Sequence, residues 1–235
     1  MARPRLVLLP GLAADEQMWR SQSEALADWQ PAVADVHRHH ATLPDMAGAL
    51  LEQFEGDLAL CGASMGGMLA MEAARQAPQR IAGLALLGTT ARPESQDMRQ
   101  VREAAIELFA QGMVREVIEP NVAFAFHPSR AREGRLVGSY LEFVLRAGAD
   151  QLIRQNRAVI MRPDARTHLP LLRCPTLVMC GDADQLTPKD CAEEIAALIP
   201  GAQLVIVPEC GHMLTMERPD FVNASLGRWL DKLAP

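Results

Sequence analysis

Short apolar runs alternate with helical patterns along the first third of the chain. The apolar runs predict buried strands at residues 5–9, 32–36, 57–61 and 81–87. Apolar positions at helical spacing between these runs predict helices at residues 16–26, 45–54 and 67–75. Strands that alternate with helices usually pair in parallel. This part of the chain therefore predicts an α/β fold, with a mostly parallel central sheet flanked by helices.

The pattern changes between about residues 92 and 162, where no run is typical of a buried strand. Helical patterns follow one another there, at residues 96–110, 113–118, 130–146 and 150–161. The alternation then resumes, with strands predicted at residues 175–180 and 203–207 and helices at residues 188–198 and 219–233. We therefore expect a core built from residues 1–91 and 169–235, interrupted by an all-helical cap at residues 92–168.

Composition narrows the class of protein. The chain has 235 residues, of which 49% are apolar and 22% charged, as in ordinary globular proteins. A net charge of −6 without a cluster of Lys and Arg disfavours nucleic acids and anionic membranes as partners. Five cysteines without a C-x-x-C pair argue against a disulfide framework or a zinc site. No apolar run has the length of a membrane span or a signal-peptide core, so we expect a cytoplasmic protein.

A Gly-x-Ser-x-Gly motif, residues 62–66, stands between a predicted strand and a predicted helix. In this context the motif is typical of a nucleophile elbow, in which a sharp turn exposes a serine hydroxyl above the sheet. Glycines suit such a turn because a Cβ would clash where the two backbones approach. The placement of the motif favours Ser64 as a nucleophile, while a small residue at a tight turn stays the alternative.

A serine nucleophile needs an adjacent base, and the base needs a third group to orient it. Asp182 and Asp184 follow the strand predicted at residues 175–180, and His212 follows the strand predicted at residues 203–207. Side chains at the carboxyl ends of parallel strands lie at one edge of a sheet, so we expect these groups to meet Ser64. Either aspartate could instead cap the helix that begins near residue 188.

These motifs, in the chain order Ser, Asp, His, resemble the α/β-hydrolases. The resemblance is to the capped group that includes small esterases, enol-lactonases and meta-cleavage C–C hydrolases, and the central block matches it only in position and helical character. It implies Ser64 as the nucleophile and His212 as the general base. It favours Asp184 as the acid, because residues 181–188 match the family's G-x-x-D-x-x-x-P loop.

The resemblance also implies an oxyanion hole made by the backbone N–H groups of Leu12 and Met65. Many relatives carry His-Gly where this chain has Pro10 and Gly11, a departure that leaves a backbone donor in place. Polar residues near the end of the helical block, including Arg162, and methionines beside the elbow and His212, including Met65, are candidates for the substrate pocket. The substrate-binding set predicted on these grounds is Gly11, Met68, Asn156, Arg157 and Met213.

The other histidines and the cysteines have less specific interpretations. We expect His37, His39 and His40 to face solvent, although one of them could edge the pocket. His127 and His168 fall within the helical block and at its end, as surface or rim residues. Cys61 and Cys210 are expected to be small buried residues, since buried thiols are usually inert.

The resemblance implies acyl transfer to serine, which needs no metal and no organic cofactor. The first hypothesis is a hydrolase of small or medium carboxylic esters, including lactones and thioesters. The second is a C–C hydrolase acting on a meta-cleavage diketone, and the third is a ligand-binding protein that keeps this fold without turnover. Haloalkane and epoxide chemistry would usually place an aspartate at the position of Ser64. The oligomeric state stays open.

Overall fold

A computed structural model of the chain describes residues 3–234. Six parallel strands form one sheet in the order β2-β1-β3-β4-β5-β6. The strands are β1 (Arg5–Leu9), β2 (Ala32–Val33), β3 (Leu58–Ala63), β4 (Ile81–Leu87), β5 (Thr176–Gly181) and β6 (Gln203–Val207). The predicted fold class is confirmed. β3 and β5 are buried along their whole length, as expected of parallel strands covered on both faces.

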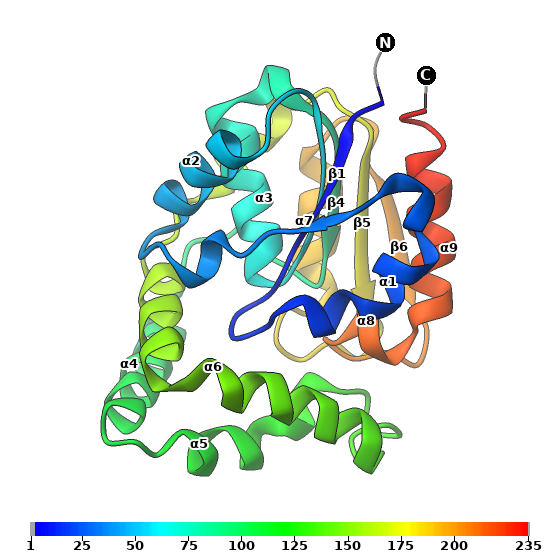
Figure 1. Cartoon of the computed structure of the whole chain (residues 1–235). Coiled ribbons are helices and arrows are strands. Elements are labelled where there is room, and N and C mark those ends of the chain that lie inside the picture. Colours follow the sequence, from blue (N-terminus) through cyan, green and yellow to red (C-terminus); the bar gives the residue numbers. More distant parts are fainter. Residues whose placement is uncertain (1–2, 235) are drawn as a thin grey trace.

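Helices cover both faces of the sheet (Figure 1). One face carries α2 (Leu43–Gln53), α3 (Met65–Gln76) and α7 (Lys189–Leu198), and the other carries α1 (Arg20–Ala25), α8 (Leu214–Glu217) and α9 (Pro219–Leu230). Successive side chains of a strand point to opposite faces. Accordingly, Val7 and Leu9 join the apolar cluster of the first face, whereas Leu6 and Leu8 join the cluster of the second.

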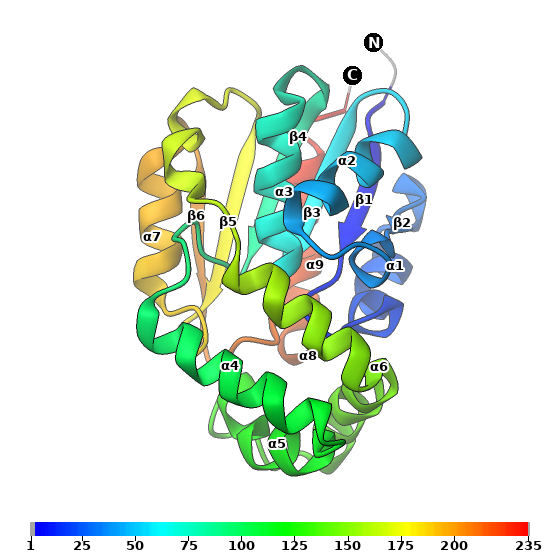
Figure 2. The same cartoon turned by 90° about the vertical axis from the view of Figure 1, so that its left-hand side faces the viewer.

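The chain between β4 and β5 is helical, as predicted. It forms α4 (Gln96–Ala110), α5 (Val114–Asn121) and α6 (Gly134–Ile160), which lie beyond the carboxyl ends of the strands (Figures 1 and 2). Phe109, Phe126 and Phe143 anchor this block, because they are buried in the same apolar cluster as the second face of the sheet. We call this block the cap; the exact limits of a separate domain, residues 92–168, stay a prediction.

The two helices predicted at residues 130–146 and 150–161 correspond to the two halves of α6. α6 runs from Gly134 to Ile160, and its helical geometry is broken at Gly148. Gly148 has φ 73° and ψ 174°, a conformation that is open essentially to glycine alone. The kink lets the two halves of α6 follow different directions, and the second half approaches the core (Figure 1).

Other differences from prediction are local. The predicted strand 32–36 is only two residues long, because Val36 already begins the 3₁₀ turn η3 and β2 pairs only with Val7 and Leu8. The predicted helix 16–26 is a 3₁₀ turn followed by α1, and α8 was not predicted because it is only four residues long. The 3₁₀ turns are η1 (Glu16–Trp19), η2 (Ala27–Trp29), η3 (Val36–Arg38), η4 (Pro78–Arg80), η5 (Val122–Ala125), η6 (Ala165–Thr167) and η7 (Leu169–Leu171). No helix within residues 3–234 is both long enough and apolar enough to cross a membrane.

The turn from β3 into α3 brings three backbone segments close together. Ser64 has φ 54° and ψ −118°, a strained conformation for a residue with a side chain. A Cβ at Gly66 would lie 2.0 Å from the carbonyl oxygen of Leu9, and a Cβ at Gly62 would lie 2.2 Å from the carbonyl oxygen of Gly66. Only glycine fits at these two positions, which explains the motif at the level of packing.

We expect Gly66→Ala to lower the free energy of unfolding by about 3 kcal/mol, because the new methyl group overlaps backbone that cannot move aside. Gly227→Ala, in α9, is the matched control, because within residues 3–234 nothing but its chain neighbours and its own helical backbone lies within 4 Å of the added Cβ. That substitution should raise the free energy of unfolding by about 0.5–1 kcal/mol through helix propensity. Urea unfolding measures both values, and equal small changes in the two variants would contradict the close approach.

Candidate active site

The three side chains predicted to act together meet at the carboxyl edge of the sheet. Ser64 follows β3, Asp184 follows β5 and His212 follows β6. The Nε2 atom of His212 lies 3.0 Å from the Oγ atom of Ser64, and its Nδ1 atom lies 2.9 Å from Oδ2 of Asp184. The Asp184 side chain is fully buried and that of His212 nearly so. A hydroxyl, an imidazole and a buried carboxylate in this series are the groups that an activated serine nucleophile requires.

The loop after β5 holds the Asp184 carboxylate in place. The backbone N–H groups of Leu186 and Thr187 donate to Oδ1, each at 2.9 Å, and the Thr187 hydroxyl donates to Oδ2 at 3.0 Å. Burial opposes the charge of this carboxyl group, but nearby His212 and these donors hold its pKa below the ordinary value. Thr187 was not predicted as a site residue; the signal was its position three residues after an aspartate in a tight turn.

Asp182, the alternative acid, binds backbone groups and not the His212 ring. Its carboxylate accepts hydrogen bonds from the backbone N–H groups of Glu209 and Cys210, both at 3.0 Å. It thereby ties the loop after β5 to the loop that carries His212. Of the two aspartates, the structure brings Asp184 to the His212 ring.

The environment of His212 favours its charged form. Burial disfavours the imidazolium, but the adjacent Asp184 carboxylate outweighs burial and raises the pKa of His212 above its ordinary value of 6.5. The Ser64 hydroxyl faces Nε2 of the same ring, so that nitrogen is placed to take a proton from serine.

The cap supports the loop that carries His212. The backbone N–H groups of His212 and Met213 donate to the carbonyl oxygen of Ala125, at 3.0 and 3.1 Å. Buried Glu217 accepts from the N–H groups of Gly211 at 2.9 Å and of His127 at 2.7 Å. None of these contacts was predicted, because their partners come from separate elements of the chain.

Two backbone N–H groups near Ser64 are available to a ligand. Met65 is the first residue of α3, and its N–H has no acceptor within residues 3–234. The N–H of Leu12 likewise has no acceptor in the part of the chain that the structure describes. The loop that carries Leu12 lies against the serine, because a Cβ at Gly11 would be 3.4 Å from Cβ of Ser64. These are the two groups that the resemblance implies for an oxyanion hole.

Two predicted pocket residues of the cap lie in different surroundings. Asn156 is buried, where it donates to the carbonyl oxygen of Leu152 and accepts from Arg102 at 2.8 Å. Arg157 is exposed on α6. Arg162 is buried and forms an ion pair with Glu94 at 2.8 Å, so its charge is already paired.

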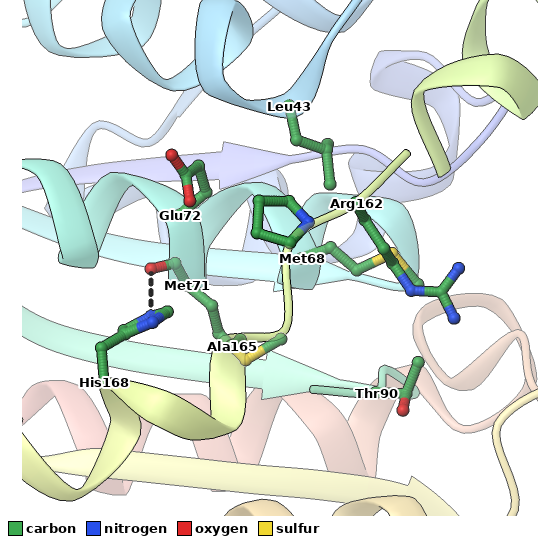
Figure 3. A pocket seen from close by; sticks show the side chains of 9 residues that line it. Leu43, Met68, Met71, Glu72, Thr90, Arg162, Ala165 and His168 are labelled. Atoms are coloured by element: carbon green, nitrogen blue, oxygen red, sulfur yellow. Dashed lines mark hydrogen bonds between the residues drawn. The ribbon is translucent and has the colours of Figure 1, made fainter. Parts of the chain in front are cut away.

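The two predicted pocket methionines, Met68 and Met213, also lie in different surroundings. Met213 is buried directly after His212. Met68 lines a cavity of about 10 Å³ together with Leu43, Thr90, Arg162 and His168 (Figure 3). The cavity has room for about one water molecule and is lined by neither Ser64 nor His212, so it is too small to be the substrate pocket.

Two expectations about histidines are corrected or refined. The prediction that His37 faces solvent is wrong, because η3 turns its ring inward, where it is 1% exposed and Nε2 donates to the carbonyl oxygen of Ala14 at 2.9 Å. His168 is also buried, and its Nε2 donates to the carbonyl oxygen of Met71 at 3.0 Å (Figure 3). Cys61 and Cys210 are buried as predicted, and burial raises the pKa of both thiols.

A larger open groove of about 470 Å³ lies between η1 and α1 on one side and α8 and the start of α6 on the other. Its walls include Met18 and Thr215, which border the loops of the candidate site, and the exposed arginines Arg20 and Arg135. Ser64 and His212 do not line this groove. Among residues 3–234, no three His, Cys, Asp or Glu side chains are grouped so that they could hold a metal ion.

Comparison with known proteins identifies the family of the fold. A sequence model of the alpha/beta hydrolase fold matches residues 39–219. The chain is 24% identical over 233 residues to the pimeloyl-[acyl-carrier protein] methyl ester esterase of Nitrosomonas europaea, covering 92% of each chain. It is 27% identical to the dihydrolipoyllysine-residue acetyltransferase component of the acetoin cleaving system of Pseudomonas putida, over 97% of this chain but only 63% of that protein.

Among solved structures, a thermophilic esterase from Thermogutta terrifontis superposes with a TM-score of 0.91 and 29% sequence identity. The alignment covers 100% of this chain and 92% of the esterase. The family model and the solved structure therefore agree on the fold. The chain belongs to the alpha/beta hydrolase fold family.

Proposed function

We propose that this protein hydrolyses small or medium carboxylic esters, a class that includes lactones and thioesters, through a serine acyl-enzyme. In this proposal Ser64 is the nucleophile, His212 the general base and Asp184 the carboxylate that orients it. The observation that carries the proposal is the continuous hydrogen-bonded series, 3.0 Å from Ser64 to His212 and 2.9 Å from His212 to Asp184. The esterases among its relatives support the ester class.

The first half of the reaction forms the acyl-enzyme. The Ser64 oxygen attacks the ester carbonyl carbon while Nε2 of His212 takes the hydroxyl proton. The N–H of Nδ1 donates to Asp184, which keeps the ring in the correct tautomer and stabilises the imidazolium. The oxygen of the tetrahedral intermediate accepts hydrogen bonds from Leu12 and Met65. His212 then gives its proton to the leaving alcohol, and the C–O bond breaks.

The second half releases the acid. A water molecule attacks the acyl carbon while His212 again accepts a proton, and the same two N–H groups bind the oxyanion. Collapse of the intermediate returns the proton to Ser64 and frees the carboxylic acid. Each oxyanion donor of this kind contributes about 10²–10³-fold to the rate.

Removing the serine hydroxyl tests the nucleophile. We expect Ser64→Ala to lower kcat at least about 10⁴-fold on a panel of p-nitrophenyl esters of rising acyl length, with unfolding midpoint unchanged. The wild type should also be labelled by a fluorophosphonate, and Ser64→Ala should not. Ser139→Ala, in the open groove, is the matched control and should keep wild-type rates. A wild type that turned over a vinylogous diketone but none of the esters would transfer the function to C–C hydrolysis.

The two aspartates can be separated by equivalent substitutions. Asp184→Asn should reduce kcat about 10³–10⁴-fold, because the amide no longer holds the required tautomer of His212. Asp182→Asn should change kcat by less than about tenfold, since it touches only the backbone of the neighbouring loop. Steady-state kinetics on the best ester of the panel measures both, and the opposite order would move the acid role to Asp182.

The pH dependence follows from the raised pKa of His212. The base must be neutral to accept the serine proton, so kcat/KM should fall as the pH drops through the pKa of His212 in the free enzyme. Because the Asp184 carboxylate raises that pKa, the wild-type inflection should lie above 6.5. Asp184→Asn removes the negative charge, so the inflection of its residual activity should move to lower pH. An inflection that stays in place would show that another group titrates.

A further inference from the structure

A buried glutamine of the cap joins two backbone segments of the core. Gln155, on the second half of α6, is 0% exposed. Its Oε1 atom accepts the N–H of Ala13 at 2.7 Å, and its Nε2 atom donates to the carbonyl oxygen of His37 at 2.9 Å. Both ends of the side-chain amide are therefore used by backbone groups that lie more than a hundred residues away in the sequence.

The loop that Gln155 holds is the one that carries Leu12. Ala13 has φ 59°, in the left-handed region that a residue with a Cβ rarely adopts. At the next residue of the loop, the carbonyl oxygen of Ala14 accepts from Nε2 of His37 at 2.9 Å. Burial lowers the pKa of His37. The Nε2 atom carries the hydrogen of this bond, because a carbonyl oxygen can only accept. The amide of Gln155, the His37 residue and the loop thus form a closed hydrogen-bonded circuit.

Three of the four N–H groups from Gly11 to Ala14 have a partner. The N–H of Gly11 points to the thioether of Met18 at 3.4 Å, that of Ala13 to Gln155, and that of Ala14 to the carbonyl oxygen of Gly11 at 3.2 Å. The Leu12 N–H has no acceptor within residues 3–234. The bonds made by its neighbours leave the Leu12 N–H as the donor that the loop can offer beside Ser64.

On the basis of the proposed function, we infer that Gln155 is a positioning residue: it holds the Leu12–Ala13 peptide so that the Leu12 N–H serves the oxyanion hole. An oxyanion donor acts only when it lies about 2.7–3.1 Å from the oxygen that develops charge. The left-handed conformation of Ala13 is unfavourable in free energy unless the surrounding contacts stabilise it. Without an acceptor at Oε1, its N–H would be buried and unpaired, and the adjacent peptide planes would rotate to relieve this. The cap thereby contributes to transition-state stabilisation as well as covering the site.

A residue that merely ties the cap to the core would have a different kinetic effect. Loss of folded enzyme lowers the rate on every substrate by the same factor. Loss of an oxyanion donor weakens chiefly those reactions whose transition state places charge on oxygen. A thionoester, in which sulfur replaces the carbonyl oxygen, makes poorer use of the same donors. The ratio of kcat/KM for an ester to that for its thionoester therefore reports on the oxyanion hole and does not depend on the amount of folded enzyme.

The test compares Gln155→Met with Gln151→Met. Methionine keeps the length of the side chain but offers no amide acceptor or donor. Gln151 is buried one turn earlier on α6, and its side chain makes no hydrogen bond within residues 3–234. For Gln155→Met we expect kcat on a p-nitrophenyl ester to fall about 10–100-fold with KM within about threefold, and the ester-to-thionoester ratio to fall as well. Gln151→Met should keep both the rate and the ratio of the wild type. If Gln155→Met does not fold, Gln155→Asn withdraws the acceptor by one methylene and should lower the same ratio.

Three results would overturn the inference. An unchanged ester-to-thionoester ratio in a Gln155 variant with a reduced rate would make Gln155 a purely structural residue. A rate within about twofold of the wild type would show that the loop holds its shape without Gln155. An equal fall of the ratio in Gln151→Met would mean that the effect is not specific. Failure of the proposed function is recognised separately, because the wild type would then neither hydrolyse esters nor react with a fluorophosphonate at Ser64.

Discussion

The close approach of β1, β3 and α3 is the constraint on which the rest of the site depends. With hydrogen atoms in place of side chains at Gly62 and Gly66, the chain can turn from strand to helix within one residue. That residue is Ser64, and two hydrogen bonds hold it in its strained conformation. Its N–H donates to the carbonyl oxygen of Leu87 at 2.9 Å, and its carbonyl oxygen accepts from the Thr89 hydroxyl at 2.7 Å. The serine hydroxyl therefore stands clear of the sheet, beside the first backbone N–H groups of α3.

The remaining parts of the site are three loops, and two of them are held by groups from the cap. The aspartate loop is held by its own turn, through Leu186 and Thr187. The histidine loop bonds to the cap at Ala125, and the loop that carries Leu12 bonds to the cap at Gln155. A buried polar group without a partner is costly in free energy. These hydrogen bonds therefore give the polar groups of the loops their partners, and they also fix the conformation of the loops. The cap is in this sense a part of the site as well as a cover over it.

Much of the core could be predicted because its signals are local. β4 and β6 have the predicted boundaries, since each is a run of apolar residues ended by a turn. The break in α6 could also be predicted, because the helical pattern is interrupted near Gly148, where the backbone is non-helical. The prediction for His37 was wrong because its neighbours along the sequence are polar, whereas the turn η3 buries its ring.

The sequence by itself determined the order of the strands and helices along the chain, the elbow with its glycines, and the three residue types that meet at the edge of the sheet. These follow from periodicity and from backbone geometry, which act over a few residues. Only the tertiary structure showed that Asp184, and not Asp182, contacts the His212 ring, and that Gln155 reaches Ala13. It also showed that the N–H groups of Leu12 and Met65 have no acceptor within residues 3–234. Those outcomes depend on which backbone groups come within hydrogen-bonding distance after packing, and sequence separation carries no information about that distance.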